Sequence, residues 1–243
     1  MSQLRLASAF VETADTLTTD FDPAKYLARL ADRCVELLGA VAAGVVLFSE
    51  EQVSLVTSSD RDDWVLGLLE VQHLGGPCLD SFTTGAPVGP VPLDEPQTLT
   101  RWPDFTVRAR VQDISSTYAV PLRLRETVLG AVIVFTTHQR PRAEVELAQA
   151  LADAATIGLL HQREMSQCRE LSEQLQTALT SRVLIEQAKG LLAERWGVGV
   201  DEAFRALRRH ARTARRPLSM VAQAVMDGDL DDYALRGERN TPS

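Results

Sequence analysis

The feature that most constrains this fold is a long stretch without proline, residues 143–195, in which alanine, leucine, glutamate and glutamine dominate. These residue types favour helix, so the stretch predicts one long helix or two nearly continuous helices. The charge differs on its two sides. Residues 1–160 carry 12 basic against 21 acidic residues, a balance of −9, whereas residues 161–243 carry 13 against 12, a balance of +1. The sequence therefore predicts two domains with different electrostatic roles.

The part before this stretch has the pattern of an antiparallel sheet flanked by helices, which indicates the α+β class. Asp22-Pro23 forms a cap followed by a proline suited to a first helical turn, and it opens a helix with one apolar stripe. Residues 86–113 are rich in proline and aspartate and are expected to be irregular. The apolar stripe of the helix that follows Asp22 is Leu27, Leu30, Cys34 and Leu37/Leu38. The expected helices are residues 3–19, 23–38 and 64–71. The expected hairpins pair residues 42–50 with 52–58 and residues 116–124 with 127–137.

Apolar residues repeat at intervals of three and four along the middle of the long helix, and Arg182 interrupts them. This is a short heptad pattern, which predicts a coiled-coil linker without proving one. Residues 143–160 fit packing on their own sheet equally well, whereas pairing with a second chain is favoured beyond them. The residues of this seam are Cys168, Leu171, Leu175, Ala178 and Ile185.

Breakers divide the C-terminal part into three helices. The first ends near Trp196-Gly197, the second begins after Gly199 and stops before Pro217, and the third covers residues 219–226. Gly190 interrupts an otherwise strong helix pattern, which predicts a close contact between helices there. The expected inward faces are Leu184, Ala188 and Leu191/Leu192, then Phe204, Leu207 and Ala211, then Leu218, Val221, Ala222 and Val225.

Six arginines and no acidic residue lie within residues 205–216, although the whole chain has a formal charge of −8. A positive island on an acidic protein indicates a polyanionic partner. The alternative is a solvated helix face, but such a face normally mixes charges of both signs. Arginine also offers phosphate two parallel N–H donors, which lysine cannot reproduce.

The C-terminal motifs resemble an ANTAR domain, a family of RNA-binding transcription antitermination regulators. The matching residues are Ala188-Lys189-Gly190, Glu202-Ala203-Phe204, Leu207-Arg208, Ala211, Pro217-Leu218 and Val221-Ala222; Arg215 departs from the Asn that is usual in the family. The resemblance implies binding, usually by a dimer, to stem-loops in nascent messenger RNA, which prevents a terminator hairpin. The candidate RNA-binding residues are Lys189, Arg195, Arg205, Arg208, Arg209, Arg212, Arg215 and Arg216.

The N-terminal motifs resemble a GAF domain of the variant that commonly precedes ANTAR domains in actinobacteria. The motifs are residues 69–88 with Gly76-Pro77-Cys78, residues 101–105 (RWPDF), and residues 118–135 with the PLR and VLG sequences. GAF domains sense small molecules or act as dimerising regulatory modules, and the sequence identifies no ligand. The expected organisation is a GAF-like sensory domain (1–160), a helical linker (161–180), an ANTAR-like three-helix domain (181–230) and a disordered tail (231–243).

Several kinds of site find no support. Cys34, Cys78 and Cys168 are widely spaced, which fits reduced thiols in the cytoplasm and no disulfide framework or zinc site. Cys78 as a redox sensor and His73 as a haem ligand are weaker alternatives to structural roles. The other histidines, His138, His161 and His210, show no ligand spacing, and Trp64, Trp102 and Trp196 are expected as core or rim residues.

The sequence contains no motif for nucleotide hydrolysis, dinucleotide chemistry, acyl transfer or zinc proteolysis, no signal peptide and no membrane span. The leading hypothesis is therefore a cytoplasmic, dimeric, non-enzymatic RNA-binding antiterminator, gated by a GAF-like sensor through the linker helix, with no cofactor apart from an unidentified small-molecule ligand. Two alternatives stay open: a DNA-binding regulator with a helix-turn-helix, and a ligand- or partner-binding sensor without nucleic-acid binding.

Overall fold

The computed structural model describes residues 3–14, 16, 21–49, 52–59, 63–112, 114–137 and 142–236, and it divides into two compact units. The N-terminal unit is residues 1–165 and the C-terminal unit is residues 166–243. No helix within the described ranges is long and apolar enough to cross a membrane.

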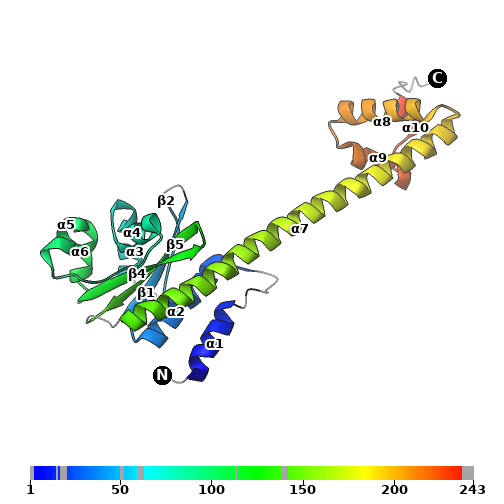
Figure 1. Cartoon of the computed structure of the whole chain (residues 1–243). Helices are drawn as coiled ribbons and strands as arrows, with labels where there is room; N and C mark the ends of the chain where they lie inside the picture. Colours follow the sequence, from blue (N-terminus) through cyan, green and yellow to red (C-terminus); the bar gives the residue numbers. More distant parts are fainter. Residues whose placement is uncertain are drawn as a thin grey trace. The chain divides into compact units, whose positions relative to one another are not determined.

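A five-stranded antiparallel sheet forms the centre of the N-terminal unit, with strand order β2-β1-β5-β4-β3 (Figure 1). The two expected hairpins are confirmed, because β1 pairs with β2 and β4 pairs with β5. Direct pairing of β1 with β5 joins the hairpins, and β3 forms one edge. The strands are β1 (Ala42–Ser49), β2 (Gln52–Ser58), β3 (Val88–Pro92), β4 (Ser116–Leu124) and β5 (Thr127–Thr136).

One face of the sheet is covered by α2 (Pro23–Leu38) and by the first part of α7, which runs from Arg142 to Trp196 (Figure 1). The predicted cap is confirmed: the Asp22 carboxylate accepts hydrogen bonds from the backbone N–H groups of Ala24 and Lys25, which lower the pKa of Asp22. The predicted stripe of α2 is also confirmed on this core, since Leu27, Leu30, Cys34 and Leu38 are buried and Leu37 is half-buried. The remaining helix, α1 (Gln3–Ala14), contacts α2.

Short helices cover the other face of the sheet: α3 (Asp63–Glu70), the 3-10 helix Val71–Leu74, α4 (Pro77–Thr84), α5 (Pro96–Arg101) and α6 (Pro103–Arg110). The expectation of an irregular segment at residues 86–113 is wrong, because β3, α5 and α6 lie within it. Pro96 and Pro103 lie in the first turns of α5 and α6. Backbone N–H groups in a first turn have no hydrogen-bond partner within the helix, so a proline, which lacks this N–H, can begin a helix there.

The long helix is confirmed as one continuous element of 55 residues, α7. Its first part is buried against the sheet, but every residue from 163 to 180 is exposed. The heptad seam predicted for this helix includes Ile185, but Ile185 packs against the core of the C-terminal unit.

The C-terminal unit packs the end of α7 against α8 (Val200–Ala214), α9 (Leu218–Asp227) and the short α10 (Asp232–Arg236). Most of the predicted inward faces lie in this core, but two expectations fail. Among the described residues, a Cβ added to Gly190 would meet nothing within 4 Å, so no close helix contact there explains this glycine. Phe204 is only half-buried, and Ala203 joins the core instead in that part of α8.

The segment expected as a disordered tail begins with α10, which contradicts disorder for residues 232–236. Leu235 on this helix is 1% exposed and belongs to the core cluster of the C-terminal unit. Burial of this leucine helps to dock a short helix that propensity alone would not stabilise. Residues 237–243 lie outside the described residues, as does His138.

Candidate nucleic-acid interface

The arginine island is built on α8, a strongly amphipathic helix. Ala203, Leu207 and Ala211 recur every four residues and bury one face, so the residues between them turn toward solvent. The helix ends where Arg215 adopts the left-handed conformation, with φ 51° and ψ 39°, and the N–H of Arg216 donates to the carbonyl of Ala211 over 3.0 Å. This end leaves both arginines exposed at the turn to α9.

Four of the predicted arginines come together on the outer face of α8. Arg205, Arg208, Arg209 and Arg212 are all exposed, and with Thr213 they line a surface depression of about 410 Å³. Nε of Arg205 donates to the carbonyl of Asp201 over 3.3 Å, which restrains that side chain. Convergent guanidinium groups around an open depression can bind phosphate groups through paired N–H donors.

Lys189 has close partners within the protein. Its side chain is 13% exposed, and Nζ lies 2.8 Å from a carboxylate oxygen of Glu186. The same Nζ stands 4.9 Å from the ring centre of Phe204, and the guanidinium of Arg208 lies 5.7 Å from that ring. Phe204 therefore acts as a platform that orders two cations, an arrangement stabilised by the electron-rich ring face.

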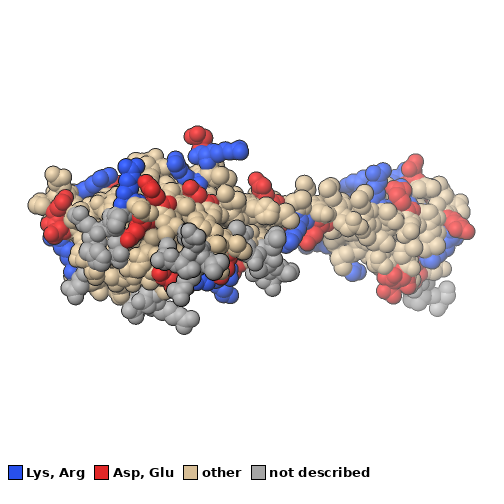
Figure 2. Space-filling model, turned by 60° about the horizontal axis from the view of Figure 1, so that its bottom comes forward, with Lys and Arg blue, Asp and Glu red and all other residues tan. Residues whose placement is uncertain are grey.

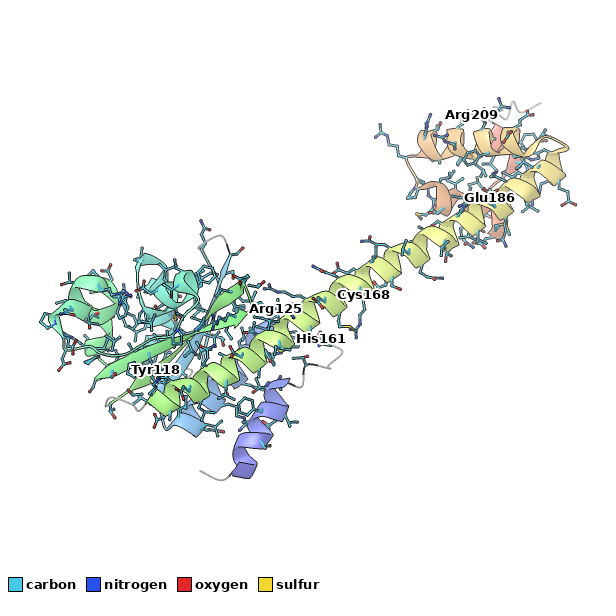
Figure 3. All side chains as sticks on the ribbon, in the orientation of Figure 1. Tyr118, Arg125, His161, Cys168, Glu186 and Arg209 are labelled. Carbon is cyan, nitrogen blue, oxygen red and sulfur yellow. The ribbon has the colours of Figure 1, made fainter. Side chains whose placement is uncertain are left out.

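Arg195 and Arg209 are engaged by α10. Nη1 of Arg195 lies 3.0 Å from Oδ1 of Asp232, and Nη2 of Arg209 donates to the carbonyl of Leu235 over 3.4 Å. Figure 3 labels Arg209 on α8 and Glu186 on α7. Sequence reasoning missed Asp232 and Leu235, although aspartates followed by Tyr-Ala-Leu are a usable signal for a short capped helix.

In the N-terminal unit, residues of the sequence motifs make contacts that stabilise the fold. Asp80 accepts a hydrogen bond from Nε1 of Trp102 over 3.1 Å and forms an ion pair with Arg101 at 2.6 Å, which joins α4 to the RWPDF motif. Cys78 is fully buried, and burial raises the pKa of its thiol, so the reactive thiolate is disfavoured. In the VLG sequence, a Cβ on Gly130 would collide with the carbonyl of Val46 on the neighbouring strand.

The tryptophans fit the expected core and rim roles, since Trp102 is buried and Trp64 and Trp196 are half-buried. The side chain of His73 lies outside the described part of the chain. Within that part, no group of three or more His, Cys, Asp or Glu side chains could hold a metal ion.

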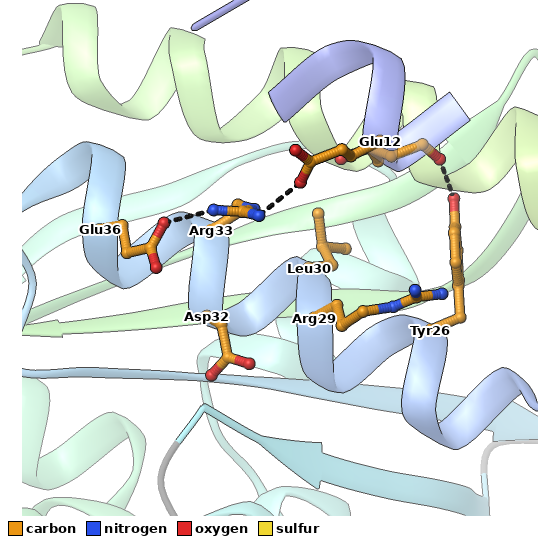
Figure 4. Close-up of a pocket in the computed structure, with 8 residues that line it drawn as sticks. Glu12, Tyr26, Arg29, Leu30, Asp32, Arg33 and Glu36 are labelled. Atoms are coloured by element: carbon orange, nitrogen blue, oxygen red, sulfur yellow. Dashed lines mark hydrogen bonds and ion pairs between the residues drawn. The ribbon is translucent and has the colours of Figure 1, made fainter. Parts of the chain in front are cut away.

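A polar cavity of about 410 Å³ lies where α1 meets α2 (Figure 4). Arg33 forms ion pairs with Glu12 of α1 and Glu36 of α2. Burial raises the pKa of Tyr26 to about 12, so its hydroxyl stays protonated and donates to the carbonyl of Thr13. These contacts tie α1 to the domain.

A larger cavity of about 630 Å³ lies where β3 meets the first turns of α7. Its size is in the range of small-molecule sites, and it combines apolar and polar lining. The lining residues are Pro87, Gly89 and Pro90 at β3, and Arg142, Val145, Glu146, Gln149, Ala150 and Asp153 on α7.

Solved structures with a similar fold share little sequence identity with this chain. The GAF domain of a phosphoenolpyruvate-protein phosphotransferase from Coxiella burnetii has a TM-score of 0.51 at 13% identity, covering 69% of this chain and 99% of that chain. A bacteriophytochrome from the photosynthetic bacterium R. palustris has a TM-score of 0.50 at 16% identity, covering 85% of this chain and 47% of that chain. No curated protein matches the sequence.

Two family matches complete the comparison. The GAF domain family matches residues 22–159, more than half of the chain, and the ANTAR domain family matches residues 173–226. The fold of the N-terminal unit agrees with the first match, and the helices at the end of the chain agree with the second. The chain therefore belongs to the GAF domain family and joins its GAF domain to a C-terminal ANTAR domain.

Proposed function

We propose that this protein is a cytoplasmic, non-enzymatic transcription antitermination regulator whose ANTAR domain binds stem-loops in nascent messenger RNA. The observation that carries the proposal is the group of four exposed arginines around one depression on α8, inside the segment that matches the ANTAR family. Guanidinium groups pair with backbone phosphates and can also stack on unpaired bases, and a stem-loop offers both.

The experiment that tests this function measures the affinity of the full chain for a hairpin RNA as salt increases. If about four arginines neutralise phosphates, log affinity falls against log salt with a slope of about 3. Replacing Arg208 and Arg212 by glutamine should reduce both affinity and slope. The matched control replaces Arg108 and Arg123, two exposed arginines of the GAF domain, and should change neither.

Competition with duplex DNA separates the RNA regulator from a DNA-binding regulator. The major groove of duplex DNA admits a helix, whereas that of paired RNA is too deep and narrow for side chains to read, so a loop-reading protein should prefer the hairpin. Stronger retention of duplex DNA would favour the DNA regulator, and a flat salt response in both titrations would favour a sensor without nucleic-acid binding.

We also propose that the protein acts as a dimer held by α7. Leu171, Leu175, Leu179 and Val183 are each more than half exposed, and a spacing of four keeps them on one broad stripe. A second copy of the same stripe is the occupant we favour, because every residue from 163 to 180 is exposed and the sequence has a heptad-like repeat there.

Control by the GAF domain is the last part of the proposal. The cavity beside β3 takes much of its wall from α7, the helix that continues into the residues matching the ANTAR family. A small molecule in this cavity would contact α7 directly. Such a ligand changes RNA binding if it favours one arrangement of the dimer over another.

A further inference from the structure

Helix α10 places oxygen acceptors on two arginines of the candidate RNA surface. The Asp232 carboxylate lies 3.0 Å from Arg195, and the Leu235 carbonyl accepts from Arg209 over 3.4 Å. A carboxylate on a guanidinium satisfies the same N–H donors that a phosphate would use. The N–H groups committed to α10 are therefore withheld from RNA while the helix is docked.

The docking of α10 is a built feature of the C-terminal unit. Leu235 is 1% exposed and shares a core cluster with Leu192 of α7 and Leu207 of α8. The helix lies beyond residues 173–226, the segment that matches the ANTAR family. It thus lies outside the matched segment and is held in place by an apolar anchor and two polar contacts.

The charge around α10 opposes the charge of α8. Residues 217–235 contain no lysine or arginine, and residues 227–232 contain four aspartates. The side chains of Arg195 and Asp232 are 41% and 32% exposed, so salt screens their pairing less than it screens a fully exposed pair. Figure 2 shows acidic and basic side chains next to one another on the visible face of this unit.

We propose that α10 is a competing acidic element that lowers the affinity of the RNA site for polyanions. It occupies Arg195 and Arg209, so a polyanion gains the full surface only by displacing Asp232 from Arg195. An RNA whose phosphates fit the surface replaces the lost contact, whereas a poorly fitting polyanion does not. This inference rests on the proposed RNA-binding function and assigns the competition to Asp232.

The test compares two variants of the full chain that lose the same charge. Asp232→Asn removes the ion pair with Arg195, and we expect affinity for a hairpin RNA to rise about 3- to 5-fold at fixed salt, the range expected for losing an accessible ion pair. Asp229→Asn is the control, because Asp229 is exposed and none of the ion pairs found among the described residues includes its carboxylate. The Asp229→Asn substitution should change the affinity for the hairpin RNA by less than about 2-fold. Circular dichroism checks that both variants keep their helices.

A double-mutant cycle identifies the contact responsible. In an Arg195→Gln background, Asp232→Asn should act no more strongly than Asp229→Asn. If the two aspartate variants have equal effects in the native background, only net charge matters. If Asp232→Asn binds RNA more weakly than the native chain, α10 supports the RNA site. Either result overturns the inference. If the native chain binds no hairpin RNA even at low salt, the proposed function itself fails; native binding with no difference between the variants removes this inference alone.

Discussion

Arg215 shows how one residue can connect stability and function. It occupies a left-handed position at the end of α8, where a side chain with a Cβ is strained and glycine or asparagine is preferred. The resemblance to ANTAR domains identified this position as the one where asparagine is usual. An exposed arginine at the same place adds a positive charge beside the α8 surface, which is consistent with strain retained for RNA contact.

Arg215→Gly should therefore stabilise the C-terminal unit by about 1 kcal/mol, and Arg215→Asn by about half as much. Thermal unfolding followed by circular dichroism measures the change. Arg216→Gly is the control, because Arg216 is equally exposed but does not have a positive φ. Loss of stability in Arg215→Gly would show that the arginine side chain contributes more than its backbone strain costs.

At the scale of elements, we predict that the exposed part of α7 holds two copies of the protein together. Leu175 and Leu179 belong to the exposed apolar stripe of α7 that we propose holds the dimer. Replacing both by glutamate puts like charges from two copies next to one another, so the dimer should dissociate. Sedimentation should then give a mass near 26.7 kDa in place of twice that value. Ser166→Glu with Thr177→Glu adds the same charge to the opposite side of the helix and should leave the dimer intact. A native chain that sediments as a monomer would contradict the seam.

Cys168 offers a second measurement of the same seam. It is exposed on α7 (Figure 3), whereas Cys34 and Cys78 are buried. Burial raises the pKa of the Cys34 thiol to about 12, so mild oxidation at neutral pH should leave that cysteine unchanged. A parallel, in-register pair brings the two copies of Cys168 together, and oxidation should then give a covalent dimer that Cys168→Ser abolishes.

Elements with strong periodicity could be predicted from the sequence, whereas those that depend on tertiary contacts could not. Two hairpins and the apolar stripe of α2 follow from local alternation and spacing. β3, α5 and α6 are too short for periodicity to show, and their prolines mark helix starts that look like breaks. α10 depends on burial of Leu235 by distant residues, which no local pattern reveals.

The candidate site shows the same division. From helical spacing alone, at least three of the four arginines of α8 could be predicted to share a face, and the structure places all four around one depression. The partners of Lys189 and Arg195 could not, because Phe204 and Asp232 reach them through packing between different helices. The prediction that all eight cations contact RNA stays a prediction, and both of these cations have competing contacts within the protein.

At the scale of the whole molecule, the question is whether the GAF cavity and the RNA site influence each other. Ala150→Trp should fill part of the cavity beside β3 and imitate a bound ligand. If the two sites are coupled, RNA affinity should change about 5-fold or more, the usual lower range for allosteric coupling. Ala143→Trp adds the same ring to an exposed position of α7 that does not line the cavity. Equal RNA affinity in both variants would argue against an input at this cavity.

The edge strand β3 has a consequence for how copies of the protein can meet. Two of its five residues, Pro90 and Pro92, have no backbone N–H. An edge that lacks this ladder of donors is a poor template for a strand from another molecule. The protein is thereby protected at this edge from pairing with a strand of another copy, so chance encounters between folded copies do not extend the sheet on this side.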